Sequence, residues 1–189
     1  MEEKLEQIDQ FETDCIKIVL YGPESTGKSS LAKALAEHYN TVYVEEFSRQ
    51  YAAHKAQNNE VLTQADVLPI AIGQMELENA SILRANRVLI CDTDLLETLV
   101  YSQFYYDGYS PEILKKKAIE NHYDLYFLTY IDLAWEADGI RDQPHNRDAL
   151  FDQFLKALKE ANKPYVIIKG SYEERLETCK KQIDNLLKS

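Results

Sequence analysis

The sequence predicts a single α/β domain, in which a five-stranded parallel sheet is covered by helices on both faces. Short apolar runs alternate with longer helical stretches along the chain, and this alternation is typical of parallel βαβ units. The runs are rich in Val, Ile, Leu, Phe or Tyr, as expected of strands that are buried on both faces. The length of 189 residues fits one domain, spanning residues 1–189.

The first half of the chain supplies three of the predicted strands. These strands are predicted at 17–21, 42–45 and 87–91. Helices are predicted to follow or separate them at 29–39, 49–57 and 64–85. The first helix carries Leu31 and Leu35 at helical spacing. Residues 1–14 are acidic and precede the first strand, so we expect a peripheral N-terminal segment.

The second half completes the alternation. Two further strands are predicted at 125–130 and 165–169, and helices at 95–105, 111–121, 148–162 and 172–188. Pro111 and Asp148 stand where helices typically begin. Residues 133–147 show neither strand nor helix periodicity and break at Gly139 and Pro144. We interpret this segment as a lid.

A glycine-rich loop joins the first strand to the first helix. Residues 22–29 read G-P-E-S-T-G-K-S and match the phosphate-binding pattern G-x-x-x-x-G-K-[ST] in full. Gly22 and Gly27 allow backbone conformations in which successive N–H groups point at phosphate oxygens, and the helix dipole adds to their effect. Lys28 would reach the β- and γ-phosphates, while the Ser29 hydroxyl would bind Mg²⁺.

The loop therefore predicts a P-loop NTPase fold with ATP and Mg²⁺ as cofactors. Ligands of open parallel sheets bind beyond the carboxyl ends of the strands, which adds the end of the last strand to the site. The predicted ATP-binding residues are Gly22, Glu24, Ser25, Thr26, Gly27, Lys28, Ser29, Ser30, Gly170 and Ser171.

Acidic residues follow the predicted strands at the same edge of the sheet. Asp92 leaves an apolar strand, where it would hold Mg²⁺ or accept a proton from an attacking hydroxyl. The alternative is a helix N-cap, a role that Thr93 or Asp94 could also fill. Glu46 is the other candidate base, and Asp92 is slightly preferred. Glu46 and Arg49 are either site residues or an ordinary ion pair at the start of a helix.

Two arginines lie in or at the end of the predicted lid. Arg141 and Arg147 would close over the transferring phosphoryl group and stabilise its charge. The alternative is a surface loop whose charges are solvated. Separately, Tyr101, Tyr105 and Tyr106 cluster on one predicted helix and could stack on a flat ring. Lys28, Asp92, Glu46, Arg141 and Arg147 are thus the candidate catalytic residues, and Ser29 and Asp92 the candidate metal ligands.

Composition excludes several other classes of protein. Thirty-two acidic against 21 basic residues give a net charge of −11, which argues against a nucleic-acid backbone or an anionic membrane as partner. The three cysteines and four histidines show no spacing typical of a disulfide framework or a metal site. No apolar run approaches a membrane span, and the N-terminus does not resemble a secretory signal. We expect a cytoplasmic protein with a small-molecule substrate; a homo-oligomer is left open.

Taken together, the motifs resemble the ribosylnicotinamide kinase domain of the NadR family. The resemblance is carried by five segments in order: 22–29, E-F-S-R at 46–49, C-D-T-D at 91–94, W-E-A-D-G-I-R-D at 135–142 and G-S-Y-E-E-R at 170–175. It implies transfer of the ATP γ-phosphate to the 5′-hydroxyl of nicotinamide riboside, on a fold similar to thymidylate kinase. The substrate-binding residues that it implies are Glu45, Glu46, Arg49, Asp94, Tyr105 and Trp135.

The chain departs from the family pattern in two places. It lacks the H-x-G-H motif of the bifunctional members, so their adenylyltransferase activity is not expected. In the family, a tryptophan that helps to sandwich the pyridine ring often precedes the E-[YF]-x-R segment, whereas this chain has Glu45 there. A carboxylate offers no stacking surface, although it could attract a cationic pyridinium. The identity of the acceptor is therefore left open.

Two alternative functions are weighed against this interpretation. A nucleoside monophosphate kinase would need a basic cluster for a second phosphate, and only Arg49, Arg84 and Arg87 are candidates. A regulatory nucleotide switch would be expected to carry N-K-x-D after a strand. Here N-K-P-Y at 162–165 precedes a strand and lacks the acid, which disfavours a guanine-specific switch.

Overall fold

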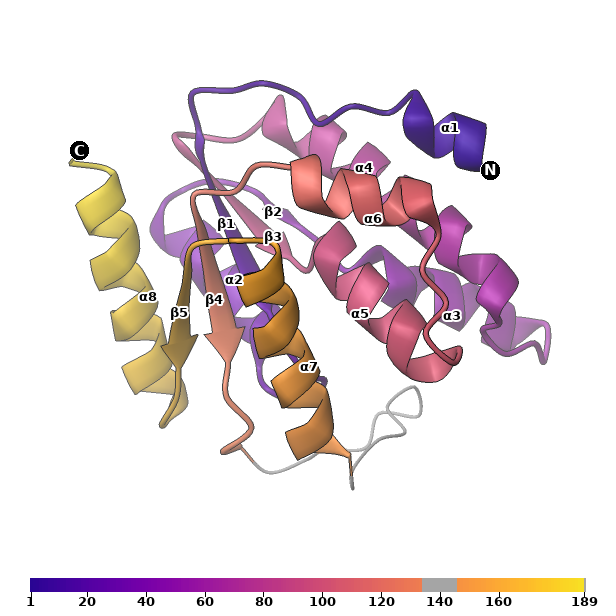
Figure 1. Cartoon of the computed structure of the whole chain (residues 1–189). Coiled ribbons are helices and arrows are strands. Elements are labelled where there is room, and N and C mark those ends of the chain that lie inside the picture. The colour runs from indigo at the N-terminus through magenta and orange to yellow at the C-terminus, as the bar shows by residue number, and fades with distance from the viewer. Residues whose placement is uncertain (134–145, 189) are drawn as a thin grey trace.

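A computed structural model of the chain, which describes residues 1–133 and 146–188, contains the predicted five-stranded parallel sheet. The strands run in the order β2-β3-β1-β4-β5 across the sheet, and every neighbouring pair is parallel (Figure 1). Their bounds are β1 Ile16–Tyr21, β2 Tyr43–Val44, β3 Val88–Asp92, β4 Leu125–Thr129 and β5 Tyr165–Ile168.

Helices cover both faces of the sheet, as predicted. Their bounds are α1 Glu2–Glu6, α2 Lys28–His38, α3 Phe47–Gln57, α4 Val67–Ile82, α5 Leu95–Tyr105, α6 Glu112–Glu120, α7 Arg147–Glu160 and α8 Tyr172–Leu186, with a short 3₁₀ helix, η1, at Gln64–Asp66. Along β1, Ile18 and Leu20 face a core shared with α2 and α8. Val19 and Tyr21 face the larger core formed by α4 to α7. The two-residue period of a strand thus divides one apolar run between two cores.

The topology places the P-loop at the centre of the carboxyl edge of the sheet. β1 lies between β3 and β4, and Leu20 of β1 pairs with Asp92 on one side and Phe127 on the other. The chain passes to opposite sides of β1 on its way to β3 and β4, and such a reversal opens a crevice for ligands. The residues that follow β1 therefore emerge where a site is expected.

The N-terminal segment, predicted to be peripheral, packs against the domain. Leu5 on α1 is completely buried in the larger core. The backbone N–H of Phe11 donates to Asn79 on α4, whose own amide donates to the Asp9 carbonyl. Lys117 on α6 donates to the Ile8 carbonyl at 3.1 Å. A helix of five residues is too short to show an apolar period, so only its tertiary contacts reveal this docking.

Small shifts in the element bounds matter for the site. β3 extends to Asp92, which was predicted to follow the strand. α3 begins at Phe47, with Glu46 at its N-cap position, two residues before the predicted start. Within residues 1–133 and 146–188, no helix has the length and apolar character needed to cross a bilayer. In the same residues, no group of three or more His, Cys, Asp or Glu is arranged to hold a metal ion.

Candidate active site

The P-loop takes a conformation that requires glycine. Gly22 has a φ of +131°, and a Cβ at this position would lie 2.7 Å from the Thr129 hydroxyl oxygen on β4. Gly27 has a φ of +83° and caps the N-terminus of α2. The Thr26 hydroxyl lies 2.7 Å from both the Pro23 carbonyl and the Thr129 hydroxyl, which ties the loop to β4. The predicted anion-binding loop at a helix N-terminus is thus formed.

Lys28 is buried against its own loop. Its ammonium donates to the carbonyls of Gly22 at 2.6 Å and Pro23 at 3.1 Å, and it lies 3.2 Å from the Glu97 carboxylate. Burial alone would lower the pKa of Lys28, but the negative charges of Glu97, Glu46 and Asp92 outweigh it and raise the pKa. Lys28 therefore remains a cation at the phosphate-binding loop.

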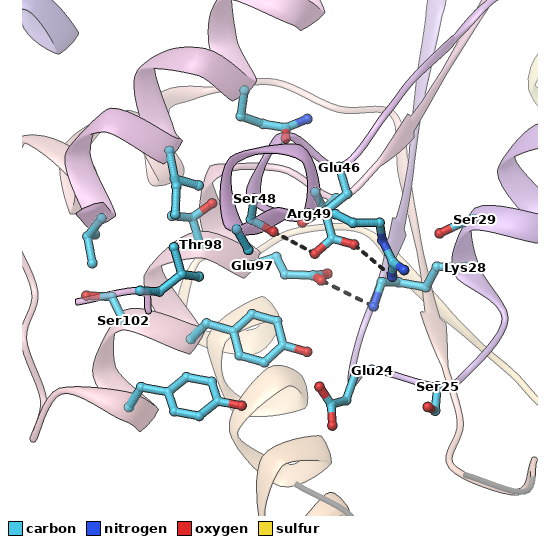
Figure 2. A pocket seen from close by; sticks show the side chains of 18 of the residues that line it. Glu24, Ser25, Lys28, Ser29, Glu46, Ser48, Arg49, Glu97, Thr98 and Ser102 are labelled. Atoms are coloured by element: carbon cyan, nitrogen blue, oxygen red, sulfur yellow. Dashed lines mark hydrogen bonds and ion pairs between the residues drawn. The ribbon is translucent and has the colours of Figure 1, made fainter. Parts of the chain in front are cut away.

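Glu97 is a site residue that the sequence did not single out. It lies on α5, is 2% exposed, and accepts a hydrogen bond from the Gly22 backbone N–H at 3.1 Å. Burial and the nearby charges of Glu46 and Asp92 raise its pKa to about 8, against the opposing effect of Lys28. Its only sequence signal is an acid within the apolar helix start L-L-E-T-L-V. Figure 2 shows its side chain directed at Lys28.

Asp92 lies at the end of β3 beside the first turn of α2. It is 2% exposed and hydrogen-bonds with the Ser29 side chain. Burial and the Glu46 charge raise its pKa to about 6. Its Oδ1 atom is buried and has no hydrogen-bond partner. A hydroxyl beside a carboxylate with an unsatisfied oxygen fits Mg²⁺, which prefers oxygen ligands and retains several waters. The predicted metal ligands, Ser29 and Asp92, thus lie together.

Glu46 and Arg49 form an ion pair at the start of α3, which is one of the two interpretations that their spacing allowed. Their side chains approach to 3.5 Å, and the Ser48 hydroxyl donates to the other Glu46 oxygen at 2.7 Å (Figure 2). Both residues line the same pocket as Lys28 and Glu97. Because the Glu46 charge affects the pKa of both Asp92 and Glu97, the pair belongs to the site as well as to the helix start.

The P-loop forms one end of a pocket of about 500 Å³. The loop residues Glu24 to Ser30 line this end. Away from the loop, the pocket is bounded by α3, α4, α5 and the residues between α3 and η1. The apolar and aromatic side chains that line it there are Ala52, Ala56, Val61, Leu62, Val67, Ile70, Tyr101, Tyr105 and Tyr106, and polar side chains line the rest. The Tyr101 and Tyr105 rings stack on each other, with centroids 6.0 Å apart.

Two predicted substrate-binding residues do not line this pocket, and their contact with an acceptor stays a prediction. Glu45 is exposed and binds the Gln50 amide and the Tyr43 hydroxyl, so it points away from the pocket lining. Asp94 is 1% exposed; it caps α5 by accepting from the Glu97 backbone N–H and also accepts from the Tyr126 hydroxyl. The cap role that the sequence left open between three residues belongs to Asp94.

Gly170 and Ser171 lie beside the P-loop rather than in the pocket. The Gly170 N–H donates to Asp132 at 2.6 Å, and the Ser171 hydroxyl caps α8. Arg175, on the first turns of α8, links these segments: it donates to the Gly170 and Thr26 carbonyls, at 2.9 and 3.0 Å, and pairs with Asp132. Their predicted ATP contact therefore stays a prediction, for a ligand that extends beyond the pocket.

The lid prediction is only partly described by the structure. Arg147 lies against the P-loop: its guanidinium donates to the Ser25 carbonyl at 3.4 Å and to the Leu133 carbonyl at 2.9 Å. Burial and nearby Arg175 lower its pKa, although acidic neighbours oppose this effect. Arg141 and Trp135, also predicted for the site, lie outside the described residues.

Replacing Arg175 with alanine should destabilise the protein by about 3–5 kcal/mol, because Asp132 and three backbone carbonyls would lose a buried cation. Urea unfolding monitored by circular dichroism measures this loss. Lys156→Ala removes an exposed cation paired with Glu160 and should change stability by less than about 1 kcal/mol. Equal losses in the two variants would mean that Arg175 is not a structural link.

Comparison with known proteins agrees with this geometry. The family model described as "AAA domain", AAA_28, matches residues 17–175. The trifunctional NAD biosynthesis/regulator protein NadR of Salmonella typhimurium is 28% identical over 174 residues, which cover 90% of this chain. The chain spans only about two fifths of that relative, 42% of its length. The predicted resemblance to NadR is thus confirmed in sequence.

Solved structures show the same fold. A NadR protein crystallised in complex with NR superposes with a TM-score of 0.66 at 24% identity, covering 84% of this chain and 47% of the other. Thymidylate kinase from Ehrlichia chaffeensis superposes with a TM-score of 0.63 at 15% identity, covering 93% of this chain and all of the other. These likenesses confirm the predicted P-loop kinase fold. With the AAA domain model covering most of its length, the chain belongs to the AAA domain family AAA_28.

Proposed function

We propose that the chain is an ATP- and Mg²⁺-dependent kinase that transfers the γ-phosphoryl group of ATP to the 5′-hydroxyl of nicotinamide riboside. The observation that carries the proposal is one continuous pocket, in which the P-loop meets a compartment lined by tyrosines, with acids beside the junction. Sequence similarity to NadR, and the NadR structure in complex with NR, support this choice of acceptor.

The donor half of the site is built from the P-loop. Backbone N–H groups of the loop and of the first turn of α2 would bind phosphate oxygens, and Lys28 would place its charge on the β- and γ-phosphates. Arg147 lies close enough to the loop, through its contact with the Ser25 carbonyl, to act on the same anion. Ser29 and Asp92 would hold Mg²⁺, which supplies charge neutralisation for the transferring group.

The acceptor half is the compartment beside α5. Tyr105 is 39% exposed at the pocket wall and stacks with Tyr101, so an aromatic surface is available for a flat ring. The pocket is lined by the acids Glu24, Glu46 and Glu60 against the bases Lys28 and Arg49, so acids outnumber bases even when Glu97 is protonated. A nucleoside with a cationic pyridinium ring is better matched to such a pocket than a neutral nucleoside or a phosphorylated one.

The chemistry needs little covalent work from the protein. The acceptor hydroxyl oxygen bonds to the γ-phosphorus while the bond to the β,γ-bridging oxygen breaks, and the hydroxyl proton passes to a carboxylate. Asp92 or Glu46 would take this proton, since Glu46 lines the pocket and Asp92 lies near enough for the Glu46 charge to raise its pKa. ADP and nicotinamide mononucleotide then leave. Lys28 and Arg147 would stabilise the charge that develops on the transferring group.

Direct assay of the purified chain tests the proposal. The chain is incubated with ATP, Mg²⁺ and one acceptor at a time, namely nicotinamide riboside, thymidine, deoxyadenosine or thymidine monophosphate, and mass spectrometry identifies the product. We expect nicotinamide mononucleotide as the preferred product. Turnover of another acceptor but not of nicotinamide riboside would assign a different nucleoside or nucleotide kinase. No phosphorylated acceptor, with hydrolysis of ATP alone, would favour a regulatory NTPase.

Replacing Tyr105 with alanine should raise the KM for nicotinamide riboside by about 3- to 10-fold, because an aromatic contact contributes roughly 0.5–1.5 kcal/mol. The KM for ATP should not change, since Tyr105 lies away from the P-loop end of the pocket. Steady-state kinetics with each substrate varied in turn measures both values. Tyr105→Phe keeps the ring and should behave like the wild type; a defect of equal size in both variants would contradict ring stacking.

A further inference from the structure

Glu97 connects the two halves of the pocket. Its carboxylate contacts the P-loop at two points, the Gly22 backbone N–H at 3.1 Å and the Lys28 ammonium at 3.2 Å. It is carried by α5, the helix that also presents Tyr101 and Tyr105 to the acceptor compartment. An acid in this position is not required by the fold, because α5 already has an N-cap in Asp94.

The Lys28 ammonium donates hydrogen bonds to two carbonyls and forms an ion pair with Glu97 in the conformation observed. An ammonium group has three N–H donors. Three acceptors lie within reach of them, which are the Gly22 carbonyl, the Pro23 carbonyl and the Glu97 carboxylate. A triphosphate that engages Lys28 therefore competes with the Glu97 carboxylate for this cation. Of the three acceptors, only the Glu97 carboxyl group can carry a negative charge. When ionised, it also repels phosphate oxygens.

We propose that Glu97 is a positioning residue that competes with the phosphates of ATP for Lys28 and thereby weakens nucleotide binding. When ATP binds, the Lys28 ammonium moves from the Glu97 carboxylate to phosphate oxygens, and no covalent bond changes. When ADP leaves, Glu97 recaptures the ammonium and limits the affinity for product. The inference rests on the proposed function only in that ATP is the nucleotide.

The charges around Glu97 determine the condition under which the competition is strongest. The charges of Lys28 on α2, Glu46 before α3 and Asp92 on β3 shift the pKa of Glu97. The Glu97 charge in turn raises the pKa of the hydroxyls of Tyr21 on β1 and Tyr101 on α5. The Glu97 pKa of about 8 means that the carboxylate is largely ionised at about pH 9. Nucleotide binding is therefore best measured at that pH.

Isothermal titration calorimetry on the whole chain with Glu97→Gln tests the inference. The glutamine keeps an oxygen for the Gly22 N–H but removes the charge. The Kd for ATP should fall about tenfold, because ATP would no longer have to replace the charge-assisted contact that Lys28 makes with Glu97 in the free protein. The Kd for AMP should not change, because AMP lacks the phosphates that Lys28 reaches. Unchanged or weaker ATP binding would overturn the inference, because a merely structural role predicts a loss for both nucleotides.

Two further variants separate competition for Lys28 from general repulsion. Glu45→Gln removes the same charge from an exposed site outside the pocket and should leave both affinities unchanged. In a Lys28→Met background, Glu97→Gln should no longer tighten ATP binding, as a double-mutant cycle requires of coupled residues. A gain that persists in this background would overturn the inference. Glu97→Asp, which retains the charge on a shorter side chain, should give a smaller gain of the same sign.

These measurements use nucleotide without an acceptor, so their outcome does not depend on whether nicotinamide riboside is the acceptor. If nicotinamide riboside is not phosphorylated but Glu97→Gln tightens ATP binding, the proposed acceptor is wrong and the role of Glu97 stands. If nicotinamide riboside is phosphorylated and Glu97→Gln does not tighten ATP binding, the proposed acceptor stands and the inferred role of Glu97 is wrong.

Discussion

Replacing Lys28 with alanine should lower kcat by at least about 10³-fold, because the variant loses the one cationic side chain of residues 22–29, which would bind the β- and γ-phosphates. Backbone N–H groups of the loop would still bind the anion, so the loss should be larger in kcat than in affinity. The release of ADP at saturating ATP and nicotinamide riboside, followed with a coupled assay, measures the effect.

The fold should survive this substitution. Lys28→Ala leaves Glu97 without its cation, but burial already raises the pKa of Glu97, so this carboxyl group takes up a proton instead of remaining as an unpaired buried charge. Near-wild-type circular dichroism is therefore expected. Lys33→Ala, an exposed lysine on the same helix, is the matched control and should retain full turnover. If Lys28→Ala kept more than about a tenth of the wild-type kcat, Lys28 would not be part of the proposed mechanism.

The fold was predictable because its signals are local. The apolar run before the loop, the loop itself and the helix after it occupy residues 16–39 without interruption, and each constrains the next. Strand burial on both faces then follows from the continuous apolar runs, and parallel pairing follows from the helices between them. Exact bounds were less predictable, as Asp92 shows, because pairing with Leu20 of β1 extends β3 by one residue.

The site was predictable only where a motif fixes it. Lys28, Ser29, Asp92 and Glu46 share one region because they follow neighbouring strands, which topology alone can predict. Topology does not predict the direction of a side chain. Glu45 and Glu46 are adjacent, yet Glu45 binds Gln50 at the surface and Glu46 lines the pocket. Such choices depend on helix starts, here the N-cap position of Glu46.

Glu97 and Arg175 are two residues whose roles local sequence patterns do not reveal. Both are charged, both are almost completely buried, and both contact the P-loop from helices far along the chain. Glu97 lies in no motif, and Arg175 ends the segment 170–175 that carries the family resemblance but had no role assigned to it. Their burial arises only when α5 and α8 pack on the sheet. Long-range packing therefore completes a site that a local motif begins.

Asp92→Asn should lower kcat by about 10²- to 10⁴-fold, the range expected when a general base is removed. Asparagine has nearly the same shape and can still hydrogen-bond with Ser29, but it accepts no proton and carries no charge for Mg²⁺. Pre-steady-state measurement of product formation, at several Mg²⁺ concentrations, separates the two losses. Rescue by added Mg²⁺ would indicate a metal ligand, whereas a rate that does not respond would indicate the base.

The stability of this variant makes the result interpretable. The pKa of Asp92 is higher in the folded protein than its ordinary value, so the folded state binds the proton more tightly than the unfolded state does. The stability that protonated Asp92 contributes is present below about pH 4 and is lost as pH rises through about 6. At neutral pH, asparagine avoids the cost of a buried charge, and the Tm should therefore be equal to or higher than that of the wild type. A lower rate in a more stable protein cannot result from unfolding. Near-normal turnover of Asp92→Asn, together with a large loss in Glu46→Gln, would instead assign proton transfer to Glu46.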